Sequence, residues 1–470
     1  MPEHLGRLRQ LLGTDSVLDA GADTEPYLTD FRGLYHGRAL AVVLPRTVGQ
    51  VSQLLSYCNE ARIGVVPHGG NTSYCGGATP DESGQQVVLA LARLDRIRSV
   101  DAASYSLVAE AGCVLAKVRR AAEDADRFFA LSLGSEGSCQ IGGNLSTNAG
   151  GTNVVRYGMM RDQVLGLEVV LADGQVLSSL TALRKDNTGY DVKALFLGAE
   201  GTLGVITAAS LRLYPRPRVT ATAFIAVPDV AHAVALLAEL RAASGDTVSS
   251  FELLPRIAVE LAVRHIPGTR DPLDGASPWY VLCELTSAGA DVPLEETLTS
   301  ALGRAAEQGM LSDAVLARSE RERAALWHLR EHVPEAQKRE GASLKHDLSV
   351  PIGSLPAFVE RGAEWVRANV PDGILVAYGH VGDGNLHFNV SQASGADAAR
   401  FLARADSVMR ALHDLVREFG GSFSAEHGIG RLKVGELERY APPAELALMR
   451  AIKQALDPNG ILNPGKVLRA

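Results

Sequence analysis

The stretch Ile374–Val390, ILVAYGHVGDGNLHFNV, contains two β-rich runs on either side of a glycine-rich turn. The dipeptide Asp383-Gly384 between two such runs is typical of a β-hairpin. If the strands pair across this turn, His380 and His387 come together at its mouth. Strand alternation places Asn389 on the same face as His387 and turns three apolar residues to the other face: Leu386, Phe388 and Val390.

A carboxylate and a third imidazole follow at Glu426 and His427. Two histidines and one glutamate are a common ligand set for a divalent metal that keeps open positions for a substrate. The competing interpretation is that His380 and His387 are surface histidines of a turn and that Glu426 forms a salt bridge. Glycine-rich segments nearer the N-terminus favour the metal interpretation, because they indicate a protein that binds a ligand.

Length and composition indicate a globular protein of two or three domains, with 470 residues, 46% of them hydrophobic and 21% charged. The net charge of −8 argues against nucleic acid or an anionic membrane as a partner. We find no apolar run of membrane-spanning length and no signal-peptide pattern at the N-terminus. Five scattered cysteines indicate reduced thiols and a cytoplasmic protein.

The first glycine-rich segment follows a predicted strand, helix and strand, at residues 39–44, 47–58 and 63–66. Its sequence, PHGGNTSYCGG at residues 67–77, matches neither G-x-G-x-x-G nor a P-loop. Consecutive glycines nevertheless expose backbone N–H groups that form a nest for a phosphate. An ordinary multi-turn connection is the alternative for this loop taken alone.

Two more glycine-rich segments lie at residues 133–151 and 201–207, and a hairpin is predicted at residues 164–176 with its turn at Asp173-Gly174. The segment 133–151 contains Ser, Thr and Asn between its glycines, so its amides and hydroxyls are suited to a flat, polar ligand. Gly201–Thr207 leads into a strand at residues 210–213. Three such loops in one α/β region favour a bound ligand over three plain turns.

A proline-rich stretch at residues 214–218 marks a domain boundary. Strands and helices then alternate as in an α+β domain with an antiparallel sheet and helices on one face. The predicted strands are 220–227, 251–254, 279–286 and 314–317. One predicted helix follows the first of these strands and ends at residue 243, and the others cover residues 294–308, 320–339 and 397–419.

Six ordered motifs, PHGGNTSYCGG, GSCQIGGNLSTNAGG, EGTLGVIT, GHVGDGNLH, EHGIG and LNPGK, resemble the vanillyl-alcohol-oxidase-type flavoprotein family. The chain is most similar to its D-2-hydroxyglutarate dehydrogenase-like branch. The resemblance implies an α+β protein with a PCMH-type FAD-binding domain at 1–217 (core about 36–216) and an FAD-linked-oxidase-type substrate, or cap, domain at 218–425. It implies that residues 426–470 return to the FAD domain.

The resemblance also implies non-covalent FAD, with Gly69–Ser73 around the pyrophosphate and the second glycine segment along the adenine, ribose and flavin edges. The cofactor-binding residues expected on this basis are His68, Gly69, Gly70, Asn71, Thr72, Ser73, Gly134, Gly137, Ser138, Ile141, Gly142, Gly143, Asn144, Thr147, Asn148, Gly150, Gly151, Gly204, Val205, Ile206 and Asn463. Some relatives attach FAD through a histidine, which makes His68 the alternative attachment point.

For the chemistry, the resemblance implies a metal on His380, His387 and Glu426, namely Zn²⁺ with Mn²⁺ or Co²⁺ as alternatives. Asn389 and His427 are expected beside the substrate, and the substrate segment maps its cationic anchors onto Arg330 and Lys345. Two features depart from the branch. Pro334 stands where a Ser or Thr is usual, and Ser73 stands where Gly is common.

The expected reaction is oxidation of a D-2-hydroxyacid, first D-2-hydroxyglutarate and then D-malate, with hydride moving to flavin N5. A metal acidifies the substrate hydroxyl, and His427 suits a general base, although it also suits a residue that orients a ligand. Arg330 suits one carboxylate and Lys345 a second one. Salt bridging on a helix surface and a solvated charge are the plainer alternatives for these two cations.

Three other activities remain open from the sequence: a D-lactate or glycolate dehydrogenase of the same family, an oxygen-using oxidase, and a flavin-binding subunit without turnover. The third is disfavoured because His380, His387 and Glu426 are all present. The expected partners are a small 2-hydroxyacid, a separate electron acceptor (electron-transfer flavoprotein or a quinone) and a second copy in a homodimer.

Overall fold

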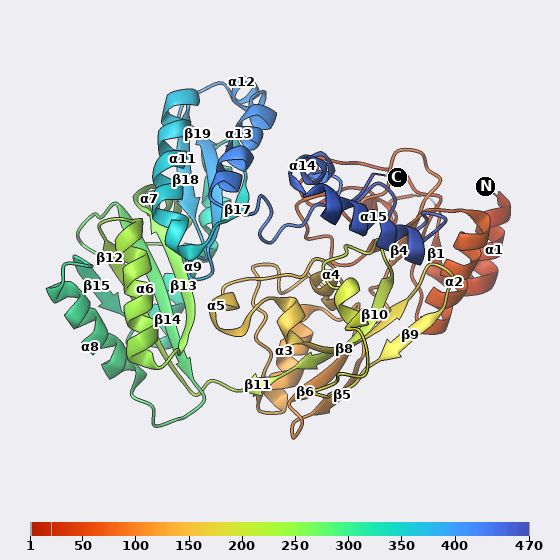
Figure 1. Cartoon of the computed structure of the whole chain (residues 1–470), viewed down its shortest axis with the longest axis horizontal. Helices are drawn as coiled ribbons and strands as arrows, with labels where there is room; N and C mark the ends of the chain where they lie inside the picture. Colours follow the sequence, from red (N-terminus) through yellow and green to blue (C-terminus); the bar gives the residue numbers. More distant parts are fainter. Residues whose placement is uncertain (1, 20, 470) are drawn as a thin grey trace. The chain divides into compact units, whose positions relative to one another are not determined.

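The chain passes back and forth between two compact units in the computed structural model, which describes residues 2–19 and 21–469 (Figure 1). Unit 1 contains Met1–Gly150, Met159–Arg216 and Glu426–Ala470. Unit 2 contains Gly151–Gly158 and Pro217–Ala425. The short excursion of Gly151–Gly158 into unit 2 has no counterpart in the sequence-based expectation.

The first sheet of unit 1 has the order β1-β2-β4-β3, with β2 (Ala41–Val43), β4 (Val87–Ala90) and β3 (Val65–His68) parallel. The edge strand β1 (Val17–Leu18) is antiparallel. The crossover helix α2 (Val48–Ala61) begins at Thr47, whose hydroxyl accepts the Gln50 N–H at 3.2 Å. Its apolar face is buried at Val51, Leu54, Leu55 and Cys58.

At the same end of α2, the Gln50 side chain accepts the N–H of Arg46 at 2.7 Å.

The second sheet of unit 1 is antiparallel, with the order β5-β6-β10-β8-β9. Its strands are β5 (Ile97–Asp101), β6 (Ser106–Glu110), β10 (Val205–Arg212), β8 (Val164–Val170) and β9 (Val176–Ser179). The predicted hairpin is confirmed as β8 and β9, which turn at Gly174 with φ of 87°. Strand β10 begins at Val205, earlier than the predicted start at Ser210, because the run after Gly204 is already fully buried.

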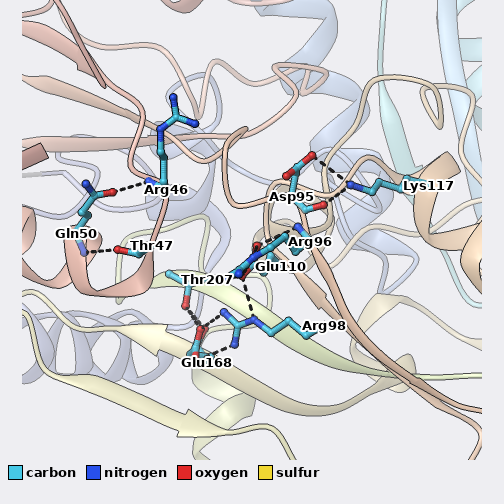
Figure 2. A network of polar contacts seen from close by, with 10 residues as sticks. All are labelled: Arg46, Thr47, Gln50, Asp95, Arg96, Arg98, Glu110, Lys117, Glu168 and Thr207. Carbon is cyan, nitrogen blue, oxygen red and sulfur yellow. Dashed lines mark hydrogen bonds and ion pairs between the residues drawn. The ribbon is translucent and has the colours of Figure 1, made fainter. Parts of the chain in front are cut away.

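A buried charged network joins four strands of this sheet (Figure 2). Arg98 on β5 bonds to Glu110 on β6 at 3.1 Å and to Glu168 on β8 at 2.9 Å. Glu168 also accepts the hydroxyl of Thr207 on β10 at 2.9 Å. Each carboxylate is compensated by several donors, which is the condition under which a charge is tolerated in a protein interior.

The C-terminal segment of unit 1 contains α14 (Val434–Tyr440) and α15 (Pro443–Leu456) (Figure 1). Beyond α15 the chain pairs with β3. The Val65 N–H donates to the Ile461 carbonyl at 2.7 Å, and the Asn463 N–H donates to the Val65 carbonyl at 2.8 Å.

Unit 2 has an antiparallel sheet of order β13-β14-β12-β15, as expected for the α+β domain. The strands are β12 (Val219–Val227), β13 (Val248–Pro255), β14 (Trp279–Ser287) and β15 (Asp313–Leu316). Helices α6 (Val230–Ser244) and α8 (Leu294–Glu307) lie along one face of it (Figure 1). Helix α7 (Arg256–His265) follows β13 directly.

The predicted hairpin of residues 374–390 is confirmed as β18 (Gly373–Tyr378) and β19 (Asn385–Gln392). Strand β18 ends at Tyr378, so His380 belongs to the connecting loop and not to the strand. Short strands β16 (Ser343–Leu344) and β17 (Asp347–Ser349) pair with the other edge of β19. Helix α11 (Leu355–Asn369) covers the apolar face, where the rings of Phe358 and Phe388 lie 5.1 Å apart.

Two long predicted helices are each broken into two. Residues 320–339 form α9 (Glu320–Glu331) and α10 (Val333–Glu340), with Pro334 in the first turn of α10. A proline is tolerated there because the N–H groups of a first turn have no intrahelical partner. Residues 397–419 form α12 (Ala398–Leu402) and α13 (Ala405–Glu418).

The other helices and strands are short: α1 (Pro2–Leu12), α3 (Leu115–Asp124), α4 (Ile141–Ser146), α5 (Val154–Tyr157), β7 (Arg127–Phe128) and β11 (Tyr214–Pro215). Among the described residues, no helix combines the length and the apolar character that crossing a membrane requires.

Candidate active site

The first two glycine-rich segments contact each other through their backbones in unit 1. A Cβ placed on Gly70 would lie 2.2 Å from the Ser138 carbonyl oxygen, and one on Gly69 would lie 3.6 Å from the Cα of Gly143. Such close approach requires glycine at position 70, because the clashing atom belongs to the backbone. Gly134 and Gly137 differ, since a Cβ at either meets no atom of the described chain within 4 Å.

Several buried polar atoms in and around these segments have no hydrogen-bond partner within the described part of the chain. They are His68 Nδ1 and Nε2, Gln140 Oε1, Asn144 Oδ1 and Asn463 Oδ1. Buried polar groups are almost always paired, so a cluster of such atoms indicates a missing ligand with donors and acceptors of its own. These residues fit a polar dinucleotide such as FAD.

The other predicted FAD residues have different surroundings. The side chain of Asn71 donates to the Thr29 carbonyl at 2.8 Å, and that of Thr147 donates to the Gly143 carbonyl at 2.9 Å. Asn148 accepts the Arg161 N–H at 2.9 Å. Ile141, Val205 and Ile206 belong to the apolar core, and a Cβ on Gly204 would lie 2.6 Å from Val169.

His68 is buried at the end of β3, with its ring 5.0 Å from that of Tyr27. Burial lowers the pKa of its imidazole to about 4, so the ring is neutral at physiological pH.

The EHGIG motif is bound tightly to the first glycine loop within unit 1. The carboxylate of Glu200 accepts the N–H groups of Ile429 and Gly430 at 2.7 and 2.8 Å. The Cys75 carbonyl accepts the Arg431 N–H at 2.8 Å, and a Cβ on Gly430 would lie 2.2 Å from that carbonyl. Burial raises the pKa of Glu200 while the two backbone donors lower it. Glu200 is the first residue of the EGTLGVIT motif, but the sequence alone assigned it no role of its own.

His427 stacks on Tyr74 of the first glycine loop, with ring centroids 4.5 Å apart and an interplanar angle of 15°. The ligand atoms of Glu426 and His427 lie within 4.8 Å of each other. Tyr74 fixes one face of the predicted base, and nothing in the sequence marked it for that role.

On the hairpin of unit 2, the rings of His380 and His387 lie 5.4 Å apart, as the pattern predicted. Strand pairing places Asp347 directly opposite His387, and their ligand atoms lie within 4.8 Å of each other. The Asp347 carboxylate is buried and accepts the side-chain N–H of Asn385 at 2.9 Å. Asp347 is therefore an additional candidate ligand that sequence reasoning missed.

His380 is buried at 7% exposure, so it is not a surface turn histidine. Its Nδ1 lies 2.7 Å from Oε1 of Glu252, a fully buried residue of β13. The other carboxylate oxygen accepts Arg330 at 2.8 Å from Nε and 2.6 Å from an Nη. The Arg330 guanidinium also lies 5.0 Å from the centre of the Tyr378 ring. Arg330 is thus a buried residue of an ion pair and not a surface cation.

Burial alone would raise the pKa of Glu252, but His380 and Arg330 outweigh it and lower the pKa to about 2. Burial raises the pKa of Asp383, in the hairpin loop, to about 6, and His380 partly opposes that shift. An acid within the otherwise apolar run Phe251–Leu254 is the sequence signal that was available for Glu252.

Asn389 is buried, with its side-chain oxygen accepting the His346 N–H at 3.1 Å and its nitrogen donating to Gln337 at 3.1 Å. Gln337 also donates to Ser391 at 3.0 Å, so it binds two residues of the same β19 face. Lys345 is half-buried between β16 and β17, next to His346.

Comparison with known proteins shows the family of the chain. The family model of the FAD binding domain matches residues 39–179, and that of FAD linked oxidases, C-terminal domain, matches residues 216–467. The chain belongs to the FAD-linked oxidase family. These matches confirm the predicted family. They also confirm that the chain has an FAD-binding domain and is an oxidoreductase.

Known relatives are similar to this chain over nearly its whole length. It is 39% identical to the mitochondrial D-2-hydroxyglutarate dehydrogenase of Arabidopsis thaliana over 465 residues, which cover 98% of this chain and 80% of the relative. It is 41% identical to that of Bos taurus over 458 residues, covering 96% and 81%. A solved structure of p-cresol methylhydroxylase, 19% identical, matches with a TM-score of 0.78 over 100% of this chain and 97% of the other, which confirms the α+β fold.

Proposed function

We propose that the protein oxidises a D-2-hydroxyacid to the 2-oxoacid with FAD, and that D-2-hydroxyglutarate is preferred, with D-malate second. The observation that carries this proposal is the grouping of His380 and His387, on the hairpin, with Asp347 on the adjoining strand β17. The buried cation Arg330 lies beside the same hairpin. Two relatives named D-2-hydroxyglutarate dehydrogenase, 39% and 41% identical, support the substrate.

FAD bound in unit 1 would supply the two-electron oxidation of substrate C2, with N5 as the hydride acceptor. The buried polar atoms of His68, Gln140, Asn144 and Asn463 that have no partner among the described residues would supply contacts for it. We propose non-covalent binding, in which the neutral His68 ring offers one hydrogen-bond donor and one acceptor.

We propose His380, His387 and Glu426 as ligands of a divalent metal, Zn²⁺ first, with Mn²⁺ or Co²⁺ as alternatives. Asp347 is a further candidate ligand. When bound, such a metal acidifies the substrate hydroxyl and fixes its orientation.

Residues of this chain accept the hydroxyl proton and bind the carboxylates of the substrate. We propose that His427 accepts the hydroxyl proton, held in place by stacking on Tyr74. Arg330 and Lys345 bind the two carboxylates, and Asn389 lies beside the substrate. Pro334 offers no hydroxyl at its position in α10, so that end of the substrate is bound by the cations alone.

A separate electron acceptor, either an electron-transfer flavoprotein or a quinone, completes the proposed cycle. A homodimer and a cytoplasmic location are also proposed, on the resemblance and the cysteine usage. The relatives from Arabidopsis thaliana and Bos taurus carry names that place them in mitochondria.

Anaerobic bleaching of the flavin by matched D- and L-2-hydroxyacids tests the proposal. We expect rapid bleaching by D-2-hydroxyglutarate, slower bleaching by D-malate and D-lactate, and none by the L-enantiomers. Fastest bleaching by D-lactate or glycolate would select that alternative. Rapid reoxidation by oxygen alone would select an oxidase.

A strong chelator should abolish bleaching while leaving the flavin spectrum intact, and Zn²⁺, Mn²⁺ or Co²⁺ should restore it. Full activity in a preparation that elemental analysis shows to be metal-free would refute the proposed role of the metal.

A further inference from the structure

Glu252 connects two groups that the proposed reaction uses separately. One oxygen of its fully buried carboxylate faces His380 Nδ1 at 2.7 Å, and the other accepts Arg330 Nε at 2.8 Å. All three side chains are buried, and all three belong to unit 2.

The backbone fixes this arrangement. Leu253 and Gly379 exchange two hydrogen bonds, of 2.8 and 3.0 Å, across an antiparallel bridge between β13 and the end of β18. Glu252 and His380 are the adjoining residues of that bridge, so they face each other across it. Gly379 has φ of 134°, a backbone conformation that favours glycine at this junction.

The chemistry of the three groups determines where the imidazole proton sits. An ionised carboxylate only accepts hydrogen bonds, so the Nδ1 of His380 must carry a proton. Neutral His380 therefore has its lone pair on Nε2, and a histidine binds a metal through the nitrogen that carries the lone pair. A guanidinium only donates, so Arg330 also requires an acceptor, and one carboxylate satisfies both neighbours.

We propose that Glu252 is a positioning residue that fixes the tautomer and orientation of His380 for metal binding and holds Arg330 in the same network. This inference rests on the metal proposed under the function above. The removal of a carboxylate that orients a ligating histidine lowers metal affinity by about 10- to 100-fold.

The substitution Glu252→Gln tests this role because an amide cannot satisfy both neighbours. Arg330 has only donors, so the amide oxygen turns toward it and the NH₂ group faces His380. Nδ1 must then accept, which moves the proton to Nε2 and removes the lone pair that a metal needs. Adding Arg330→Met frees the amide oxygen to accept from Nδ1, so the double variant should recover much of the lost affinity.

Glu284→Gln is the matched control. Glu284 lies on the adjacent strand β14, is also buried, and accepts Arg323 at 3.0 Å, the Trp327 indole at 2.9 Å and Thr222 at 2.9 Å. These partners include no predicted metal ligand. The change therefore removes a buried charge from the same sheet while sparing the proposed tautomer.

The measurement is Zn²⁺ affinity of the FAD-loaded full chain, by competition with a chromogenic chelator, together with the visible absorption of the Co²⁺ form. We expect weaker Zn²⁺ binding and an altered Co²⁺ spectrum for Glu252→Gln, neither effect for Glu284→Gln, and equal FAD occupancy in both.

Metal binding by Glu252→Gln as tight as that of the unaltered protein overturns the inference, as does a double variant no tighter than the single one. If Glu252→Gln does not fold, Glu252→Asp decides: its shorter side chain keeps the charge, and unchanged affinity overturns the role. An unaltered protein that binds no metal refutes the proposed metal itself, a result distinct from these.

Discussion

His68 lies where β3 enters the first glycine loop, and its burial makes folding sensitive to pH. The pKa of the imidazole falls from 6.5 to about 4 in the folded chain, so between these values only the unfolded state takes up the proton. The free energy of unfolding should therefore be unaffected by His68 above pH 6.5 and decrease by about 3 kcal/mol as the pH falls to 4.

Urea unfolding of the FAD-loaded protein at several pH values measures this, with His68→Gln as the variant that lacks the titration. The difference in unfolding free energy between the two proteins should change over that range. His36→Gln, on an exposed histidine, is the control. Parallel curves for His68→Gln and the unaltered protein would show that the buried ring is not the cause.

The two cations of the substrate segment should act differently. Loss of a cation that pairs a desolvated carboxylate costs about 2 to 5 kcal/mol. Lys345→Ala should lower kcat/KM for D-2-hydroxyglutarate and D-malate far more than for D-lactate, whereas Arg330→Ala should lower it for all three. Because Arg330 pairs with buried Glu252, its removal should also destabilise the fold by about 3 to 5 kcal/mol.

Rates for both cation variants must therefore be expressed per FAD-loaded molecule. Equal losses for lactate and hydroxyglutarate in Lys345→Ala would rule out a second-carboxylate role for that lysine.

At this scale, sequence patterns found the residues that are local to a motif and missed their distant partners. The approach of His380 and His387 follows from hairpin alternation alone. Glu252 lies 128 positions from His380 in the sequence, and Glu200 lies 229 positions from Ile429. Such pairings depend on how sheets meet, which no local period encodes.

At the scale of the elements, the close contact between the first two glycine-rich segments can be tested at Gly70. Gly70→Ala places a Cβ 2.2 Å from a backbone oxygen of the facing loop, so the loops must separate. Gly6→Ala in α1 is the control, because Gly6 lies in unit 1 outside the predicted FAD residues and its Cβ meets no described atom within 4 Å. We expect Gly70→Ala to lower FAD occupancy, measured from flavin absorbance, and Gly6→Ala to keep it. Equal occupancy in both would show that the close contact does not support the cofactor site.

Element types were largely predictable, whereas helix continuity was not. The pattern of residues 320–339 continues through Pro334, but the structure divides it at His332 so that the proline falls in a first turn. The break between α12 and α13 at Ala403–Arg404 has no breaker residue in the sequence. The second break is set by surroundings that the local sequence does not encode.

In the whole molecule, the division into units depends on contacts that cross long stretches of chain. The segment Gly151–Gly158 joins unit 2 because the Arg156 guanidinium donates to the Thr286 hydroxyl at 2.7 Å and Ser250 donates to the Asn153 side chain at 3.3 Å. In the sequence, these residues follow the predicted cofactor segment directly, and no proline-rich stretch separates them from it. By contrast, the proline-rich stretch 214–218 marks the boundary between the units at Arg216 in the sequence itself.

The separate apolar cores predict that the two units unfold separately. The clusters around Leu107 and Leu55 are built from unit 1, and the cluster around Leu282 is built from unit 2. All three tryptophans, Trp279, Trp327 and Trp365, belong to unit 2, whereas the unpartnered polar atoms at the predicted FAD site belong to unit 1. Tryptophan and flavin fluorescence therefore report on different units.

We expect urea to produce two midpoints, one for flavin release and one for tryptophan exposure. A large-to-small change in a buried core costs about 2 to 5 kcal/mol, so Leu107→Ala should shift the flavin midpoint and Leu282→Ala the tryptophan midpoint. FAD at 100 times its Kd stabilises the state that binds it by about 2.7 kcal/mol, and should raise the flavin midpoint alone. A single midpoint that moves with either substitution would contradict independent units, because two cores that unfold together respond as one.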